Sequence, residues 1–128
     1  MLKRLLLVLA VCVTAVGCGS RPIMNVDNAP VVGPTGRSLT VAQVQDAIVA
    51  AGTKLGWAMS PVRPGLLSGR IVLRTHTAII DVAYDAKQYS IRYKDSVNLN
   101  AGDGNIHKNY NGWIENLDKG IRAELLRL

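Results

Sequence analysis

The chain has 128 residues, of which 48% are hydrophobic and 19% charged, and this length supports one globular domain rather than two. The formal net charge is +6, and removing Lys3 and Arg4 from the 15 basic residues leaves 13 dispersed ones against 9 acidic residues. Because nucleic-acid-binding domains concentrate positive charge on one face, the dispersal argues against a nucleic-acid partner. Both cysteines, Cys12 and Cys18, lie near the N-terminus, which excludes a disulfide framework for a domain that follows them.

The first seventeen residues have the composition of a signal peptide. Lys3 and Arg4 supply positive charge, residues 5–16 form an uncharged apolar run, and Gly17 places a small residue before Cys18. A membrane-spanning helix needs about twenty apolar residues, so this shorter run favours a cleaved signal over a permanent span. We predict a lipoprotein signal peptide at residues 1–17 and a lipid on Cys18, because several acyl chains on one residue anchor a protein durably.

The tetrad around the second cysteine, Ala15-Val16-Gly17-Cys18, resembles the lipobox of bacterial lipoproteins. In a lipobox the Cys receives a diacylglycerol, and the peptide is cut before it. Ala15 departs from the Leu that is usual three residues before the Cys. In bacterial lipoproteins that this tetrad resembles, an acidic residue after the Cys typically retains the protein in the inner membrane. Gly19 and Ser20 are not acidic. The sequence therefore predicts an outer-membrane anchor, with the domain facing the periplasm.

Residues 18–37 have the composition of a flexible, lipid-anchored tether. Three of the five prolines, Pro22, Pro30 and Pro34, fall here together with Gly33 and Gly36, and no helical or strand periodicity is visible. Fully extended, about eighteen residues would reach roughly 60 Å from the membrane. We expect a single folded domain at residues 38–128, with some of residues 23–26 packed onto it.

A helix is predicted at residues 41–55. Thr40 and Gln43 match a capping box, and Leu39 and Val44 match a hydrophobic staple across the first turn. Gly56 stands where a helix commonly ends. The apolar side chains that recur at three- and four-residue spacing are Val41, Val44, Ile48, Ala51 and Leu55.

Strands are predicted in the middle of the chain. Alternation with a period of two indicates strands at residues 67–74, 77–84 and 89–94, and residues 85–88 form a plausible hairpin connection. Before them we expect a short strand at residues 57–59, followed by a loop that contains two prolines and a glycine. These segments predict an antiparallel meander.

The last element is predicted to be a helix that follows a loop at residues 98–105. Asn105 is the candidate N-cap, and Gly112 and Gly120 predict close packing of the helix against the sheet. Its apolar stripe comprises Ile106, Tyr110, Trp113, Leu117, Ile121 and Leu125. The expected fold class is α+β, with an antiparallel three- to four-stranded sheet and two helices packed on one face, in the order α-β-β-β-β-α.

No catalytic or metal-binding pattern is recognisable. His76 and His107 are the only histidines. A metal site or a catalytic base would require the fold to bring these distant residues together, so we predict neither a metal site nor a catalytic histidine. The loop that begins at Asn98 fails the EF-hand register, since Asp103 stands at the sixth position where Gly is required. No nucleophile elbow or phosphate-binding loop is present, and we therefore predict no enzymatic activity, no metal and no cofactor.

Two segments resemble a group of small, uncharacterised proteobacterial lipoproteins: Ser90-Ile91-Arg92-Tyr93-Lys94-Asp95-Ser96 and Ile106-His107-Lys108-Asn109-Tyr110-Asn111-Gly112-Trp113-Ile114. The resemblance extends from residue 21 to the end of the chain. It implies a lipoprotein with a compact domain, but it transfers no activity and no functional residue. A polar cluster within the two segments is our candidate binding surface, and its alternative is a hydrogen-bonded junction between the third strand and the last helix. The cluster comprises Arg92, Lys94, His107, Lys108 and Asn109.

The expected function is that of a non-catalytic, lipid-anchored envelope lipoprotein that binds another envelope component. The alternative is a binder of a small ligand or of an anionic envelope polymer, which would use a basic strand face. That face would comprise Arg70, Arg74, Arg92 and Lys94. A periplasmic enzyme is a third hypothesis, and it requires a cleft that joins a histidine to an acidic side chain.

Overall fold

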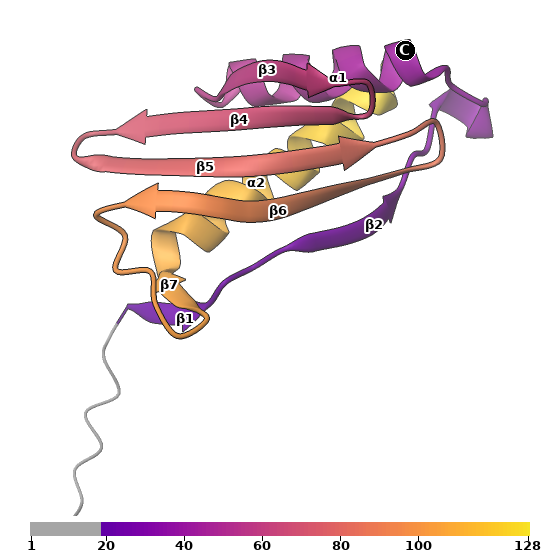
Figure 1. The fold of residues 1–128 in the computed structure, drawn as a ribbon. Coiled ribbons are helices and arrows are strands. Elements are labelled where there is room, and N and C mark those ends of the chain that lie inside the picture. The colour runs from indigo at the N-terminus through magenta and orange to yellow at the C-terminus, as the bar shows by residue number, and fades with distance from the viewer. Residues whose placement is uncertain (1–18) are drawn as a thin grey trace, which may run out of the picture.

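The computed structural model describes residues 19–128, so the predicted signal peptide and Cys18 lie outside the described residues. The fold is α+β (Figure 1): a five-stranded antiparallel sheet has the order β2-β6-β5-β4-β3, and β1 pairs with β7 in a separate two-stranded sheet. The strands are β1 (Ser20–Pro22), β2 (Val26–Pro30), β3 (Ala58–Arg63), β4 (Leu66–Leu73), β5 (His76–Tyr84), β6 (Gln88–Val97) and β7 (Asn105–His107). The helices are the short 3-10 helix η1 (Pro34–Gly36), α1 (Val41–Lys54) and α2 (Lys108–Leu125). Within residues 19–128, no helix is both long and apolar enough to cross a membrane.

Helix α1 is stabilised at both ends by the residues that predicted it. The Thr40 hydroxyl accepts a hydrogen bond from the Gln43 amide at 3.2 Å, and the Gln43 side chain accepts one from the Thr40 amide at 3.0 Å. Gly56 follows the helix with a φ of 91°, a left-handed conformation that favours glycine. The predicted helix and its capping box are therefore confirmed.

The predicted meander is confirmed, but the sheet has five strands rather than three or four. β3 continues through Pro61 to Arg63 instead of ending in a loop. Proline lacks an amide N–H, and it is tolerated here because β3 is an edge strand with only β4 beside it. The fifth strand, β2, comes from the segment that was predicted to be a tether.

The structure differs from the predicted flexible tether at residues 20–36. β2 pairs antiparallel with β6, with a register shift between Val26 and Ala29, and Asn28 within the shift has a φ of 51°. Ala29 is buried in the core. A bulge adds a residue to one strand and breaks the two-residue alternation, which is why the sequence pattern conceals this strand. Residues 20–36 therefore belong to the folded domain.

Helix α2 begins later than its predicted cap. His107, not Asn105, is the N-cap, and its Nδ1 accepts a hydrogen bond from the Asn109 amide at 3.2 Å. The predicted packing of the two helical glycines against the sheet is wrong. Gly120 lies against α1, because a Cβ there would stand 3.5 Å from side-chain atoms of Ala51 and Leu55, and a Cβ at Gly112 would meet no described atom within 4 Å.

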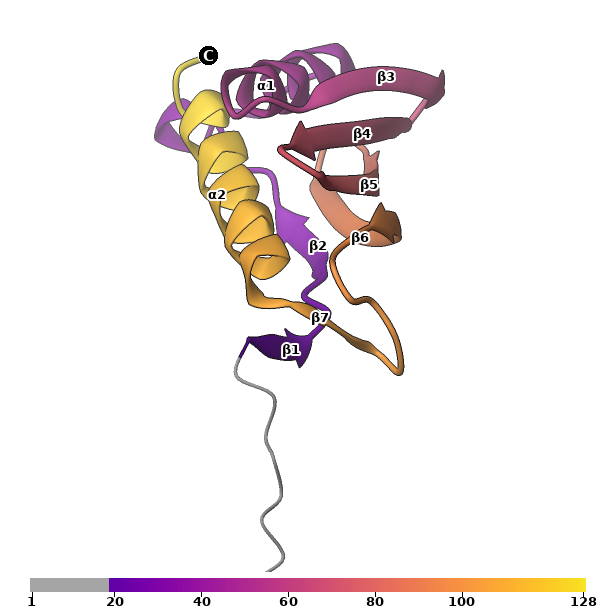
Figure 2. The same ribbon diagram turned by 90° about the vertical axis from the view of Figure 1, so that its left-hand side faces the viewer.

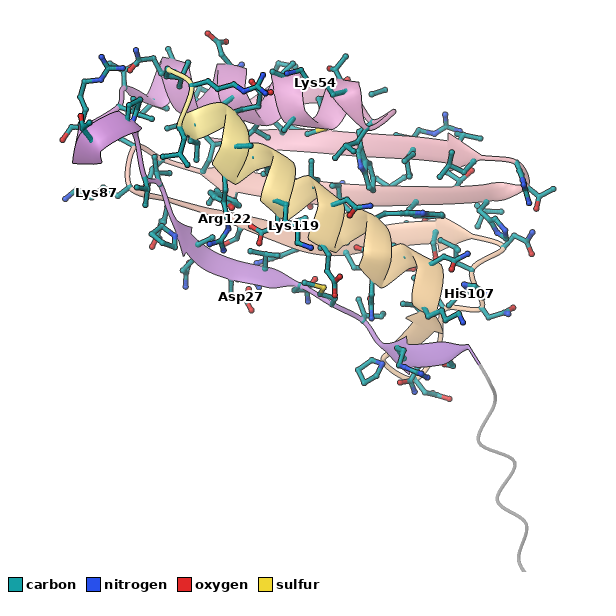
Figure 3. All side chains as sticks on the ribbon, turned by 180° about the vertical axis from the view of Figure 1, so that it is seen from behind. Asp27, Lys54, Lys87, His107, Lys119 and Arg122 are labelled. Carbon is teal, nitrogen blue, oxygen red and sulfur yellow. The ribbon has the colours of Figure 1, made fainter. Side chains whose placement is uncertain are left out.

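Both helices cover the same face of the five-stranded sheet, and they also pack against each other (Figures 2 and 3). The core lies between this helical layer and the sheet. Its fully buried members come from both layers and include Ile48, Leu67, Ile80, Tyr89, Ile91, Tyr110, Ile114, Leu117 and Ile121. The opposite face of the sheet carries no described helix (Figure 2).

Candidate binding surface

The face of the five-stranded sheet that points away from the helices is here termed the open face. Side chains alternate across a strand, so along β5 the buried Ile80 and Val82 alternate with the outward-facing Asp81 and Ala83. The helices bury the first set, and the second set lies on the open face. The open face is therefore the largest sheet surface that this fold leaves for another molecule.

A charged row crosses the middle of the open face. Ser68 on β4 pairs with Asp81 on β5, and Asp81 pairs with Arg92 on β6, so the three side chains lie side by side. Arg92 Nη2 lies 2.9 Å from Asp27 Oδ1 on β2, and Lys94 Nζ lies 3.9 Å from Asp81 Oδ1. Acidic and basic side chains thus alternate across the three strands β5, β6 and β2, and the neutral Ser68 on β4 stands beside them.

The charges of this row balance, because Asp27 and Asp81 oppose Arg92 and Lys94. The side chains of Asp27, Arg92 and Lys94 are each more than half exposed. The Asp27–Arg92 pair is exposed on both sides and contributes roughly 0–1 kcal/mol, so either partner can exchange its neighbour for a charge on another molecule at little cost. Asp81 is less exposed, and its Oδ1 is buried. The row is suited to a partner that itself carries both signs of charge.

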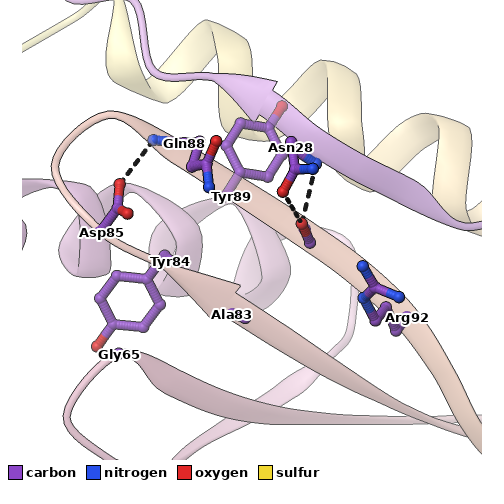
Figure 4. Close-up of a pocket in the computed structure, with 9 residues that line it drawn as sticks. Asn28, Gly65, Ala83, Tyr84, Asp85, Gln88, Tyr89 and Arg92 are labelled. Atoms are coloured by element: carbon purple, nitrogen blue, oxygen red, sulfur yellow. Dashed lines mark hydrogen bonds between the residues drawn. The ribbon is translucent and has the colours of Figure 1, made fainter.

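A polar cleft of about 280 Å³ opens at the end of the open face beside the β5–β6 hairpin (Figure 4). The lining side chains include the amides of Asn28 and Gln88, the Ser90 hydroxyl and the Arg92 guanidinium. The backbone N–H of Asn28 donates a hydrogen bond to Ser90 Oγ at 2.9 Å, and the Ser90 hydroxyl donates one to Asn28 Oδ1 at 3.4 Å. The cleft therefore offers both donors and acceptors to polar groups of a bound molecule.

Asp85 gives the same cleft a negative charge. Its Oδ1 accepts hydrogen bonds from the Lys87 amide at 2.7 Å and from the Gln88 amide at 2.9 Å. These two bonds, the one from Lys87 first, lower the pKa of the Asp85 carboxyl below its ordinary value. The carboxylate therefore stays ionised at neutral pH, and it also fixes the tight turn between β5 and β6.

The predicted polar cluster is split between two places. Arg92 and Lys94 lie on the open face, whereas His107 caps α2 and lies beside β1 (Figure 3). Lys108 and Asn109 form the first turn of α2. Asp27 and Asn28, which contact Arg92 and Ser90, were not predicted as part of the surface, because both lie in the segment predicted to be a tether.

The fold brings the two histidines together. The rings of His76 and His107 stack with centroids 6.4 Å apart and an angle of 25° between their planes. His76 Nδ1 lies 2.6 Å from the carbonyl oxygen of Asn98, an acceptor, so Nδ1 carries the hydrogen and donates it to this bond. His107 Nδ1 instead accepts a hydrogen bond from the backbone N–H of Asn109. Within residues 19–128, no group of three histidine, cysteine or acidic side chains is arranged to hold a metal ion. The two rings thus join the β4–β5 turn to the start of α2.

The fold and the open face define the class of protein: an α+β domain with helices on one sheet face and mixed charges on the other. Comparison with protein-family models, with curated proteins and with solved structures found no match for this chain. The resemblance to small lipoproteins therefore stays a prediction from the sequence segments alone.

Proposed function

We propose that this chain is a non-catalytic, lipid-anchored lipoprotein of the cell envelope that binds another envelope protein through the open face of its sheet. The observation that carries the proposal is the balanced charge row formed by Asp27, Asp81, Arg92 and Lys94 beside a polar cleft; all members of the row but Asp81 are more than half exposed. Anchoring rests on the signal-peptide pattern and on Cys18. Neither the row nor the cleft requires a cofactor to bind a partner.

The charge balance favours a protein over an anionic polymer. A polymer-binding face would present unopposed cations, but each cation of the row has a carboxylate beside it. Arg70 lies on the same face, in register with Ile79, and Arg74 lies in the β4–β5 turn with a φ of 57°. Because Asp27 and Asp81 lie among the cations of this face, the face carries both signs of charge, and a protein that also carries both is the better complement.

The proposal is tested by crosslinking in a Gram-negative host. A photoreactive amino acid replaces Ala83 on the open face, and in a matched strain it replaces Lys119, which is exposed on α2. We expect a discrete protein adduct from position 83 only. The adduct should disappear in the variant with Arg92→Glu and Lys94→Glu, because these changes reverse the cationic half of the charge row.

Anchoring is measured in the same strains with a clickable fatty acid. The parent should be labelled and should fractionate with the outer membrane, whereas Cys18→Ser should be unlabelled. Equal adducts from both photoreactive positions, or an adduct that survives charge reversal, would contradict the open face as the binding surface. Binding of purified envelope polymer that is lost on Arg92→Ala with Lys94→Ala would instead support the polymer-binding alternative.

A further inference from the structure

The folded domain begins almost at the proposed lipid anchor. Gly19 is the single residue between Cys18 and Ser20, the first residue of β1. Consecutive Cα atoms are about 3.8 Å apart, so the Cα of Ser20 lies within roughly 8 Å of that of Cys18. Membrane anchoring at Cys18 would therefore place β1 at the lipid headgroups, and no spacer would separate the domain from the membrane.

This end of the domain is held by hydrogen bonds from several elements. The Lys108 amide donates to the Gly19 carbonyl at 2.7 Å, and the Ile23 amide donates to the Gly104 carbonyl at 2.9 Å. The Asn111 side chain donates to the Pro22 carbonyl at 2.9 Å. Together with the pairing of β1 with β7, these bonds tie residues 19–23 to the β6–β7 loop, to β7 and to α2.

The surface next to the anchor is cationic. Arg21 on β1 and Lys108 at the start of α2 are both exposed, and the backbone of each lies in or beside the β1–β7 pair. Asp103 is the acidic residue of the adjoining loop. We define the anchor end as residues 19–22 and 103–108. Its exposed cations are suited to the phosphate groups of anionic phospholipids.

We infer that the anchor end rests directly on the phospholipid headgroup layer, with Arg21 and Lys108 against anionic headgroups, so that one lipid attachment also sets the orientation of the domain. This inference rests on the proposed lipid at Cys18. Helix α2 runs away from the anchor end for 18 residues, which is about 27 Å at 1.5 Å per residue. The segment around η1 and the β5–β6 hairpin lie at the opposite end of the domain (Figure 1). The polar cleft lies beside that hairpin.

The orientation is measured on the acylated full chain, purified from the envelope and reconstituted in vesicles. Ala101→Cys places one fluorophore in the β6–β7 loop, and Ser38→Cys places another near η1; both positions are exposed. The vesicles contain phosphatidylethanolamine, phosphatidylglycerol and a lipid with a spin-labelled headgroup, which quenches nearby fluorophores. We expect several-fold stronger quenching at position 101 than at position 38. Equal quenching at both positions would overturn the inference.

The role of the cations is measured by charge reversal. Arg21→Glu with Lys108→Glu should reduce quenching at position 101, whereas Lys87→Glu with Lys119→Glu, which has the same net charge change away from the anchor end, should not. Glutamate is favourable in the first turn of a helix, so the Lys108 change preserves α2. In vesicles of phosphatidylcholine with the same spin-labelled lipid and without phosphatidylglycerol, the parent and both variants should be quenched alike.

The two proposals fail in distinguishable ways. A parent chain that is not labelled by a fatty acid would overturn the lipid anchor and, with it, the orientation. If the parent is labelled by the fatty acid but the Arg21→Glu/Lys108→Glu and Lys87→Glu/Lys119→Glu variants lose quenching equally, only the headgroup contact at Arg21 and Lys108 is overturned. Neither result bears on the crosslink from the open face, which tests the binding surface.

Discussion

Two buried tyrosines differ in whether the hydroxyl group is hydrogen-bonded, and Tyr→Phe substitutions, which remove only the hydroxyl oxygen, test this difference. Tyr89 on β6 and Tyr110 on α2 are both fully buried. The Tyr89 hydroxyl donates a hydrogen bond to the Asp118 carboxylate, whereas the Tyr110 hydroxyl has no hydrogen-bond partner among residues 19–128. Burial raises the pKa of both phenols above their ordinary value, and at Tyr89 the hydrogen bond to Asp118 raises it further.

The two Tyr→Phe substitutions should change stability in opposite directions. A hydrogen bond to a charged group contributes about 1.5–3 kcal/mol, and Tyr89→Phe should cost about the lower value, since Asp118 keeps its contact with Arg122. An unsatisfied buried hydroxyl costs about 1–3 kcal/mol, so Tyr110→Phe should stabilise the domain by about 1 kcal/mol. The two variants should therefore differ by about 2.5 kcal/mol in the free energy of unfolding.

The assay is equilibrium unfolding in urea, with thermal unfolding as a second measurement. For a domain of this size the melting temperature changes by roughly 4 °C per kcal/mol, so the two variants should melt about 10 °C apart. Tyr93→Phe is the control, because the Tyr93 hydroxyl contacts a neutral partner, Ser96 Oγ at 2.8 Å. A Tyr110→Phe variant that loses as much stability as Tyr89→Phe would refute the reasoning, and it would indicate a buried water bonded to Tyr110.

Three further predictions concern the helix cap, two glycines and one turn. Thr40→Ala removes the capping box and should cost about 1 kcal/mol in urea unfolding; an unchanged midpoint would contradict the role of the cap. Gly112→Ala should stabilise α2 by up to about 1 kcal/mol, since its Cβ meets open space. Gly69→Ala should instead cost about 1–3 kcal/mol, because its Cβ would stand 2.9 Å from Ile80 Cγ1, and equal effects of the two glycine changes would refute this contrast. Asp85→Ala should destabilise the protein most at neutral pH: the folded-state pKa of Asp85 lies below its ordinary value of 3.8, so its contribution is present above that value and is lost as the pH falls through the folded-state pKa. A stability difference from the parent that stays constant between neutral pH and pH 3 would contradict this prediction.

The sequence predicted those elements whose signals are local. The capping box at Thr40 and Gln43 needs only four consecutive residues, and Asp85 accepts hydrogen bonds from amides two and three positions further on. The β4 and β5 strands alternate regularly because one face packs on helices and the other does not, and the sequence of β6 alternates between apolar and polar residues from Tyr89 to Lys94. Such local patterns predict an element without knowledge of the segment with which it pairs or packs.

The elements that escaped prediction depend on distant partners. β2 was hidden because its bulge at Asn28 breaks the alternation, and its hydrogen-bonding partner lies about sixty residues away on β6. The stacking of His76 on His107 has no local signature either, since it arises from the β4–β5 turn meeting the start of α2. Only half of the candidate surface was therefore predicted: the sequence indicated Arg92 and Lys94, but it did not indicate their acidic partners, Asp27 and Asp81.

The loss of the predicted tether changes what an anchored domain could reach. A flexible tether of eighteen residues would let the domain sample many heights and orientations, so any surface could meet a partner. If Cys18 carries the proposed lipid, β1 lies next to the anchor, and the reach would be set instead by the rigid length of α2, about 27 Å at 1.5 Å per residue. Lengthening the chain between Gly19 and Ser20 with a Gly/Ser insert should therefore preserve folding and acylation but weaken the difference in headgroup quenching between positions 101 and 38. If the crosslink from position 83 also weakens with the insert, the orientation set at the anchor end contributes to binding at the open face; if it is unchanged, the open face binds its partner at any orientation.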